Sequence, residues 1–215
     1  MTNIDRQRES SQQEIAIPPT EDLMREHGIL KRLLLIYEDA GKRLLGYKPL
    51  EPYITYPVIL QSATIARNFI ENYHQELEEK YLFRRFLKEQ IQVDLVRTLQ
   101  EQHDAAINLT SLILKSVSQG DQYMQSRKYL AHLLSLYKQM YEPHEAREDT
   151  VLFPAFREIV TAAELQALGE KFEKIEETMF GKNGFQKILK QVEQLEKACG
   201  IYELSQFTPH FTNKQ

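Results

Sequence analysis

Apolar residues recur along most of the chain at intervals of three and four positions, the spacing that places side chains on one face of an α-helix. Four such stripes can be followed, and each of them contains one histidine. The stripes are Leu23, His27, Leu30, Leu34 and Tyr37; then Ile59, Ala63, Ala66, Ile70, His74, Leu77 and Tyr81; then Val96, Leu99, His103, Ala106, Thr110 and Ile113; and finally Leu130, Leu133, Tyr137, Met140, His144, Glu148, Val151 and Ala155. The pattern predicts long amphipathic helices over 20–45, 57–88, 92–117 and 123–159.

Residues typical of helix ends and turns lie between these stripes. Thr20 is a candidate N-cap for the first helix, and Pro57, at the end of "GYKPLEPYITYP", is expected in the first turn of the second. "SQGDQ" (118–122) predicts a turn, whereas the break near 88–92 is poorly marked. Four long helices with short connections favour an all-α fold, an up-down-up-down four-helix bundle.

Two shorter helical segments follow, over 162–179 and 185–198, separated by "FGKNGF". We therefore expect three regions: a flexible polar tail over 1–17, a bundle over 18–160, and a C-terminal helical extension over 161–215. The apolar face of the last helix is expected to cover the bundle, or alternatively to meet a partner subunit.

Composition narrows the class of protein. The 215 residues carry a net charge of −4, which argues against a nucleic-acid partner, and no apolar stretch is long enough to cross a membrane. The N-terminus lacks the apolar centre of a secretory signal. Cys199 is the only cysteine, so neither a disulfide framework nor a cysteine-based metal site is available. We expect a cytoplasmic monomer or homodimer.

One motif occurs twice. "YHQELEEKYLF" (73–83) and "PHEAREDTVLF" (143–153) each place a glutamate four residues after a histidine, and the two copies are 70 residues apart. A second echo links the histidines of "REHGILKRLLL" and "EQHDAAINLTSL", 76 residues apart. The first two helices therefore resemble a hairpin that was copied into the next two, which would bring two half-sites together around a pseudo-twofold axis.

The spacing within the motif indicates metal binding. Residues four apart share one helix face, so His74 with Glu78, and His144 with Glu148, project into the same interior volume. Two buried carboxylates repel each other and are costly without a counter-charge, whereas a bound cation would remove that cost. A single buried histidine is more often a hydrogen-bonded core residue, but four at similar depth are harder to explain in that way.

We therefore predict six metal ligands: His27, His74, Glu78, His103, His144 and Glu148. His132 and His210 fall outside the pattern and are excluded. Four nitrogen and two bridging oxygen donors suit two cations, with iron favoured and manganese or zinc as alternatives. Pro143 is expected to bend the fourth helix, either incidentally or to widen the site.

The chain resembles the hemerythrin-like family, also called the HHE cation-binding domain. The resemblance rests on "EDLMREHGILKRLLLIYE", "YHQELEEKYLF", "EQHDAA" and "YEPHEAREDTVLFPAF", and it covers about 20–160. It implies a four-helix bundle around a non-haem di-iron centre, with the four histidines as terminal ligands and both glutamates as bridges. Oxygen-carrying members have a further histidine one turn along the third helix, where this chain has Ile107. That difference favours a more open site that reacts or senses over a reversible oxygen carrier.

Several functions remain open at this stage. The first is a di-iron protein that binds, senses or reduces O₂, NO or peroxide, with a possible redox or protein partner; whether it is an enzyme is undecided. Alternatives are an iron- or oxygen-sensing regulatory module and an iron-centre repair protein, although repair proteins of this family carry a cysteine in an N-terminal region and this tail has none. Glu26, Gln75 and Glu145 each lie beside a predicted ligand and are candidates to complete the metal shell.

Overall fold

The computed structural model describes residues 17–119 and 124–209. Within these ranges the chain forms six helical rods and no strands, so the all-α class is confirmed. The predicted tail over 1–17 lies almost entirely outside the described residues, as do His210 and most of the "SQGDQ" turn. None of the described helices is both long and apolar enough to cross a membrane.

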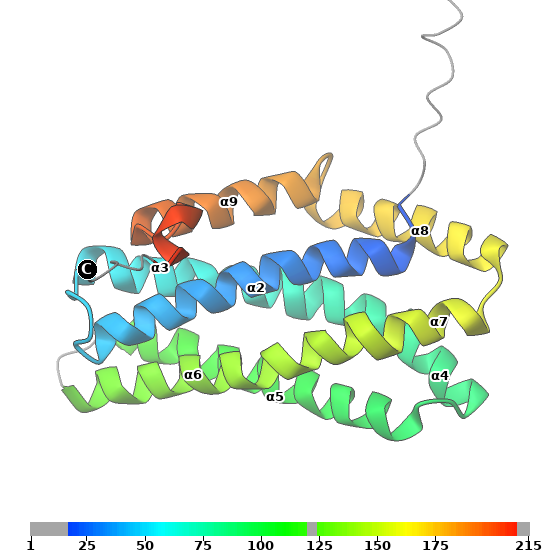
Figure 1. Ribbon diagram of the computed structural model, residues 1–215, viewed down its shortest axis with the longest axis horizontal. Helices are drawn as coiled ribbons and strands as arrows, with labels where there is room; N and C mark the ends of the chain where they lie inside the picture. The colour runs from blue at the N-terminus through cyan, green and yellow to red at the C-terminus, as the bar shows by residue number, and fades with distance from the viewer. Residues whose placement is uncertain (1–16, 120–123, 210–215) are drawn as a thin grey trace, which may run out of the picture.

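Four long rods form the bundle (Figure 1). The first is α2 (Pro19–Leu44) and the third is α5 (Val93–Gln119). The second and fourth rods each change helix type along their length. The second consists of α3 (Pro52–Ile65), η1 (Ala66–Gln75), η2 (Glu78–Phe83) and α4 (Arg84–Glu89), and the fourth of α6 (Met124–Arg147), η3 (Glu148–Leu152) and α7 (Phe153–Ile159).

Two expectations about helix ends are wrong. The N-cap of α2 is Pro18, and Thr20 lies inside the helix, where its hydroxyl accepts a hydrogen bond from Arg157. The second rod begins at Pro52, so Pro57 lies in the interior of α3. Pro52 already supplies the fixed φ angle that suits a first turn, and the connection is therefore shorter than the sequence suggested.

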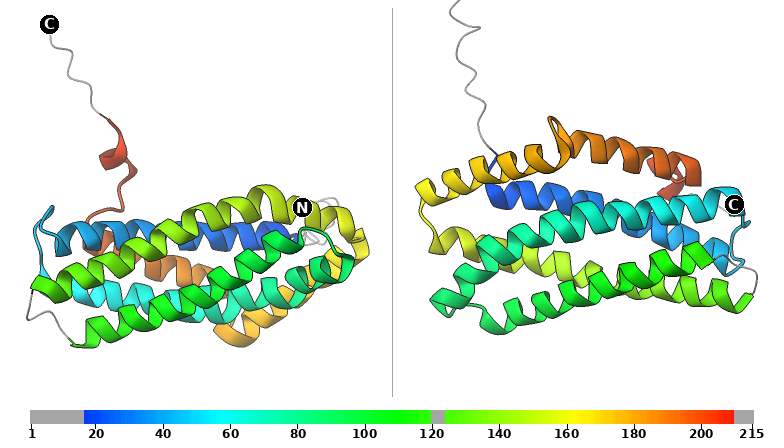
Figure 2. Two further views of the ribbon diagram at one scale, coloured as in Figure 1. Left: turned by 90° about the horizontal axis from the view of Figure 1, so that it is seen from below. Right: turned by 180° about the vertical axis from the view of Figure 1, so that it is seen from behind.

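The two remaining rods are α8 (Ala162–Phe180) and α9 (Gly184–Cys199), followed by a short 3₁₀ turn, η4 (Leu204–Phe207). Thr161 caps α8 in a capping box with Glu164. Both rods pack on this chain: α9 contacts α2 and α3, and α8 contacts α2. Figures 1 and 2 show them along one side of the bundle, away from α5 and α6.

The bundle is held together by one continuous apolar core. Apolar residues of all four predicted stripes are buried, including Leu30, Ile70, Leu99 and Leu133. The core is interrupted at one level by a group of buried polar side chains, among which are all four histidines of the stripes. Because burying such groups is unfavourable unless they are satisfied, this level is where a functional site is expected.

Candidate metal centre

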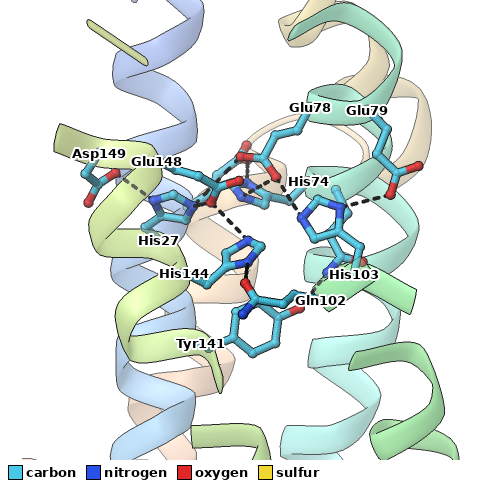
Figure 3. Close-up of polar contacts among 12 residues, drawn as sticks. His27, His74, Glu78, Glu79, Gln102, His103, Tyr141, His144, Glu148 and Asp149 are labelled. Carbon is cyan, nitrogen blue, oxygen red and sulfur yellow. Dashed lines mark hydrogen bonds and ion pairs between the residues drawn. The ribbon is translucent and has the colours of Figure 1, made fainter. Parts of the chain in front are cut away.

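The structure brings the six predicted ligands together in the interior of the bundle, and we call them the six-residue cluster (Figure 3). They come from all four rods. They form two groups of three, each with two histidines whose ring centroids lie 4.8 or 5.0 Å apart, and within each group one potential ligand atom per residue lies within 4.8 Å of the others. The groups are His27, His74 and Glu78, and His103, His144 and Glu148.

The Nε2 atoms of the four imidazoles point toward the two carboxylates. Glu78 Oε2 lies 3.5 Å from Nε2 of both His74 and His103. Glu148 Oε2 lies 3.1 Å from Nε2 of His144 and 3.3 Å from Nε2 of His27. Each carboxylate therefore approaches one histidine from each half of the repeat, the arrangement that a bridging ligand requires.

The opposite nitrogen of every ring is held by an outer acceptor. His27 Nδ1 donates to Asp149 Oδ1 at 2.7 Å and His74 Nδ1 to Glu26 Oε2 at 2.7 Å. In the neutral imidazole that a metal requires, these acceptor oxygens place the single ring proton on Nδ1 and leave the lone pair of Nε2 facing the interior. An outer partner that orients a ligating imidazole in this way is typical of protein metal sites.

The second half of the site has the same arrangement. His103 Nδ1 donates to Glu79 Oε1 and His144 Nδ1 to Gln102 Oε1, each at 2.9 Å. The partners are related by the sequence repeat, because Glu79 and Asp149 each follow a cluster glutamate. Glu26 and Gln102, in turn, each precede a cluster histidine.

A phenylalanine completes each half-site. Phe83 stacks on His103 with ring centroids 5.3 Å apart, and Phe153 stacks on His27 at 5.5 Å. Glu78 and Glu148 each begin a π-helical segment, in which backbone hydrogen bonds connect residues five positions apart. The phenylalanine five positions after each glutamate is thereby carried onto the same face of the rod. These π-helical turns shape the site, whereas Pro143, at which a bend was expected, lies inside α6.

The interior atoms lack partners among the described residues. All four carboxylate oxygens of Glu78 and Glu148 are buried without a hydrogen bond, as are Nε2 of His27 and of His103. The described residues place no lysine or arginine within ion-pair distance of either glutamate. Orphaned oxygen and imidazole donors facing one small volume fit a cation and are otherwise costly.

The pKa values of the two buried glutamates are shifted in opposite directions. Burial and the charge of Glu148 raise the pKa of Glu78 well above its usual value. Burial also opposes ionisation of Glu148, but the neighbouring His144 and His27 hold its pKa well below the usual value. Without a cation, the two glutamates therefore do not ionise equally.

The histidines are also perturbed. Burial would lower the pKa of His27, but its contacts with Asp149 and Glu148 raise it to about 9. Burial and the charge of His27 lower the pKa of His74 well below its usual value. Burial lowers the pKa of His103 as well, despite its bond to Glu79.

The three residues considered as additional ligands lie outside the cluster. Glu26 orients His74 from behind, and the Gln75 amide donates to the Tyr141 hydroxyl. Glu145 is buried, with Lys31 as a distant ion-pair partner at 3.8 Å. His132 is exposed on α6.

The outer acceptors Glu79, Gln102 and Asp149, and the stacking role of Phe83 and Phe153, were not predicted from the sequence. The repeat contained a signal for them, since each has a counterpart at the same offset from a cluster residue. Without coordinates, however, nothing distinguished these residues from other polar and aromatic positions beside the motif.

Fold and site together define a metal-binding helical bundle with histidine and glutamate ligand groups. Comparison with known families agrees: the sequence profile of the hemerythrin HHE cation-binding domain matches residues 94–213. The chain belongs to this family. The match contains His103, His144 and Glu148, extends through α8 and α9, and leaves the first half of the repeat unmatched.

The curated relatives are mycobacterial. The protein Rv1995 of Mycobacterium tuberculosis and the protein Mb2018 of Mycobacterium bovis, both described as uncharacterized, are each 42% identical to this chain over 199 residues. The alignments cover 92% of this chain and 76% of each relative. No solved structure matches the chain.

Proposed function

We propose that the six-residue cluster holds two iron ions in a non-haem, carboxylate-bridged centre that binds, senses or reduces dioxygen, nitric oxide or peroxide. One observation supports this proposal above all. Four imidazoles, each hydrogen-bonded through Nδ1 to an outer acceptor, direct Nε2 toward two buried carboxylates that have no hydrogen-bond partner among the described residues. Mixed imidazole and carboxylate donors suit iron, with manganese or zinc as the nearest alternatives. Bound iron would supply redox capacity and coordination positions open to small ligands.

The protein's own residues would prepare the site in three ways. The outer acceptors fix each imidazole with Nε2 inward, so that no rotation is needed when metal binds. The stacked Phe83 and Phe153 rings cover two of the imidazoles and limit access by water. Pairing with cations would allow Glu78 and Glu148 to ionise together, which their mutual repulsion otherwise opposes.

Metal analysis of protein purified without air, followed by absorption spectra before and after exposure to air, tests the proposal. We expect about two irons per chain and new visible absorption on oxidation. His74→Ala and His144→Ala should each reduce the metal content, whereas His132→Ala, a change of the same kind at an exposed position on α6, should not. Unchanged metal content in both cluster variants would refute the assignment.

A regulatory function is the second candidate. It is favoured by the contacts of α9 with α2 and α3, since α2 carries His27 and α3 continues directly into the segment that carries His74. Loss of metal would leave repelling carboxylates in the core and loosen these rods, which would alter the surface formed by α8 and α9. Equal rates of limited proteolysis for metal-free and metal-loaded protein would argue against this function.

A further inference from the structure

The two halves of the repeat differ in how they are covered. In the first half, Tyr73, Leu77 and Tyr81 follow one another at intervals of four on the rod that carries His74, and the two tyrosine rings contact α8. The Tyr73 ring lies 5.2 Å from that of Phe180, and the Tyr81 ring 5.5 Å from that of Phe172. Aromatic side chains of α8 therefore cover this face, and the pocket of about 290 Å³ that remains between Leu77 and Met179 has no cluster residue or outer acceptor in its lining.

In the second half the corresponding face is open. The positions 70 residues further on are Pro143, Arg147 and Val151, of which the first two are exposed and the third is partly buried. The described residues supply no rod that covers them as α8 covers the first half, and α8 and α9 lie on the other side of the bundle (Figure 1).

A pocket occupies the uncovered position. It has a volume of about 490 Å³, lies between α5 and the fourth rod, and includes Pro143, Arg147 and Val151 in its lining. Its wall also contains His144 and Gln102, the cluster histidine and the amide that orients it. The pocket thus reaches the cluster from outside at one of its four histidines.

The outer acceptor at this histidine is also different. Three of the four Nδ1 atoms donate to carboxylates, whereas His144 donates to the neutral Gln102. In the repeat, Gln102 corresponds to Glu26, which holds His74 on the covered side. Because an anionic outer partner strengthens an imidazole as a metal ligand, the open half is also the half with the weaker support.

We propose that the two metal positions are unequal: the position formed by His103, His144 and Glu148 exchanges its ion with solvent through the pocket between α5 and the fourth rod, whereas the position formed by His27, His74 and Glu78 retains its ion beneath α8. The inference rests on the proposed metal centre. It assigns the open position as the one at which small external ligands arrive, and Gln102 as a positioning residue.

The experiment measures how fast protein loaded with iron(II) loses its metal to EDTA in the absence of oxygen. The readout is the amount of metal that remains bound to the protein over time. The wild-type protein should lose its ions in two phases of similar amplitude. Thr98→Trp places a large side chain in the pocket wall and should slow only the fast phase. Asn108→Trp, at an exposed position of α5 outside the pocket, should leave both phases unchanged.

Two amino-acid substitutions test the role of the outer acceptors. Gln102→Glu gives His144 a carboxylate acceptor like the one that Glu26 provides for His74, and it should slow the fast phase by about 10-fold. This value is the lower end of the effect that outer partners have on metal affinity. Glu26→Gln makes the reverse change and should accelerate the slow phase. Each variant retains the size of the side chain it replaces.

The outcomes separate this inference from the proposed function. Wild-type protein that binds no metal ions would overturn the proposed centre itself. Two bound ions that leave in a single phase would overturn only the inequality of the positions. Two phases that Thr98→Trp and Gln102→Glu both leave unchanged would overturn the assignment of the fast phase to the pocket side.

Discussion

Replacing Glu78 by glutamine should have opposite effects on the metal-free and the metal-loaded protein. The substitution keeps the size of the side chain and removes one of the two buried carboxylates that have no partner among the described residues. In metal-free protein it removes repulsion and the cost of burying a charge. In metal-loaded protein it removes a ligand that approaches histidines from both halves of the site.

The structure sets the size of the effect. Glu78 Oε1 and Glu148 Oε2 lie 4.0 and 3.3 Å from the same atom, His27 Nε2, so the two oxygens are less than 8 Å apart. Two unit charges separated by about 7 Å repel by about 2 kcal/mol at an effective dielectric constant of about 20. Wild-type protein either bears this repulsion or keeps Glu78 protonated at a pH where the unfolded chain releases the proton. Glu78→Gln removes either cost, so at pH 8 it should raise the free energy of unfolding of the metal-free protein by up to about 2 kcal/mol.

The gain should depend on pH. Because the folded protein raises the pKa of Glu78 above its unfolded value, the stability that this group contributes is present in full below about pH 4.5 and is lost as pH rises through the folded pKa. Glutamine does not titrate, so the difference in free energy of unfolding between the variant and wild type should grow as pH rises from about 4.5 toward the folded pKa of Glu78.

Urea denaturation in EDTA at pH 5 and pH 8, repeated with excess metal, measures both effects. Bound metal should stabilise the wild-type protein by about 4 kcal/mol at a concentration 1,000 times its dissociation constant, and the variant by much less. Glu76→Gln, at an exposed position of the same rod, is the control and should change neither value. A metal-free Glu78→Gln protein less stable than wild type would show that the carboxylate is satisfied without metal, and would refute the reasoning.

Three further predictions concern regions outside the cluster. Phe172→Ala removes a buried ring of α8 that packs against Tyr81, so the free energy of unfolding in urea should fall by about 3–5 kcal/mol; a change below 1 kcal/mol would contradict the packing of α8 on the bundle. Burial raises the pKa of Glu71 although Arg67 pairs with it at 2.8 Å. The free energy of unfolding of Glu71→Gln should therefore increase relative to wild type as pH rises above about 4.5, and a decrease would show that the ion pair outweighs burial. Burial and the charge of Asp39 raise the pKa of Cys199 to about 11, so a disulfide reagent at pH 8 should modify this thiol slowly in native protein and quickly in urea; equal rates would show that α9 is not docked.

Much of the fold could be predicted because its signals are local. The spacing of apolar residues marks one face of each helix regardless of where that helix lies, so the stripes through His27, His74, His103 and His144 identified both the rods and the inward direction of each histidine. Helix ends were less certain. At Pro52 and Pro57 two prolines compete for the same first turn, and the sequence does not decide between them.

The sequence by itself determined which side chains face the interior and that the motif is doubled, because helical periodicity and repetition are properties of the chain alone. Only the tertiary structure decided which oxygen orients each imidazole and that one half of the site is covered while the other opens to a pocket. Gln102 and His144 are 42 residues apart in the chain, and the rings of α8 that close the first half come from beyond the repeat. Such contacts depend on how the rods pack against each other, which no local pattern of residues specifies.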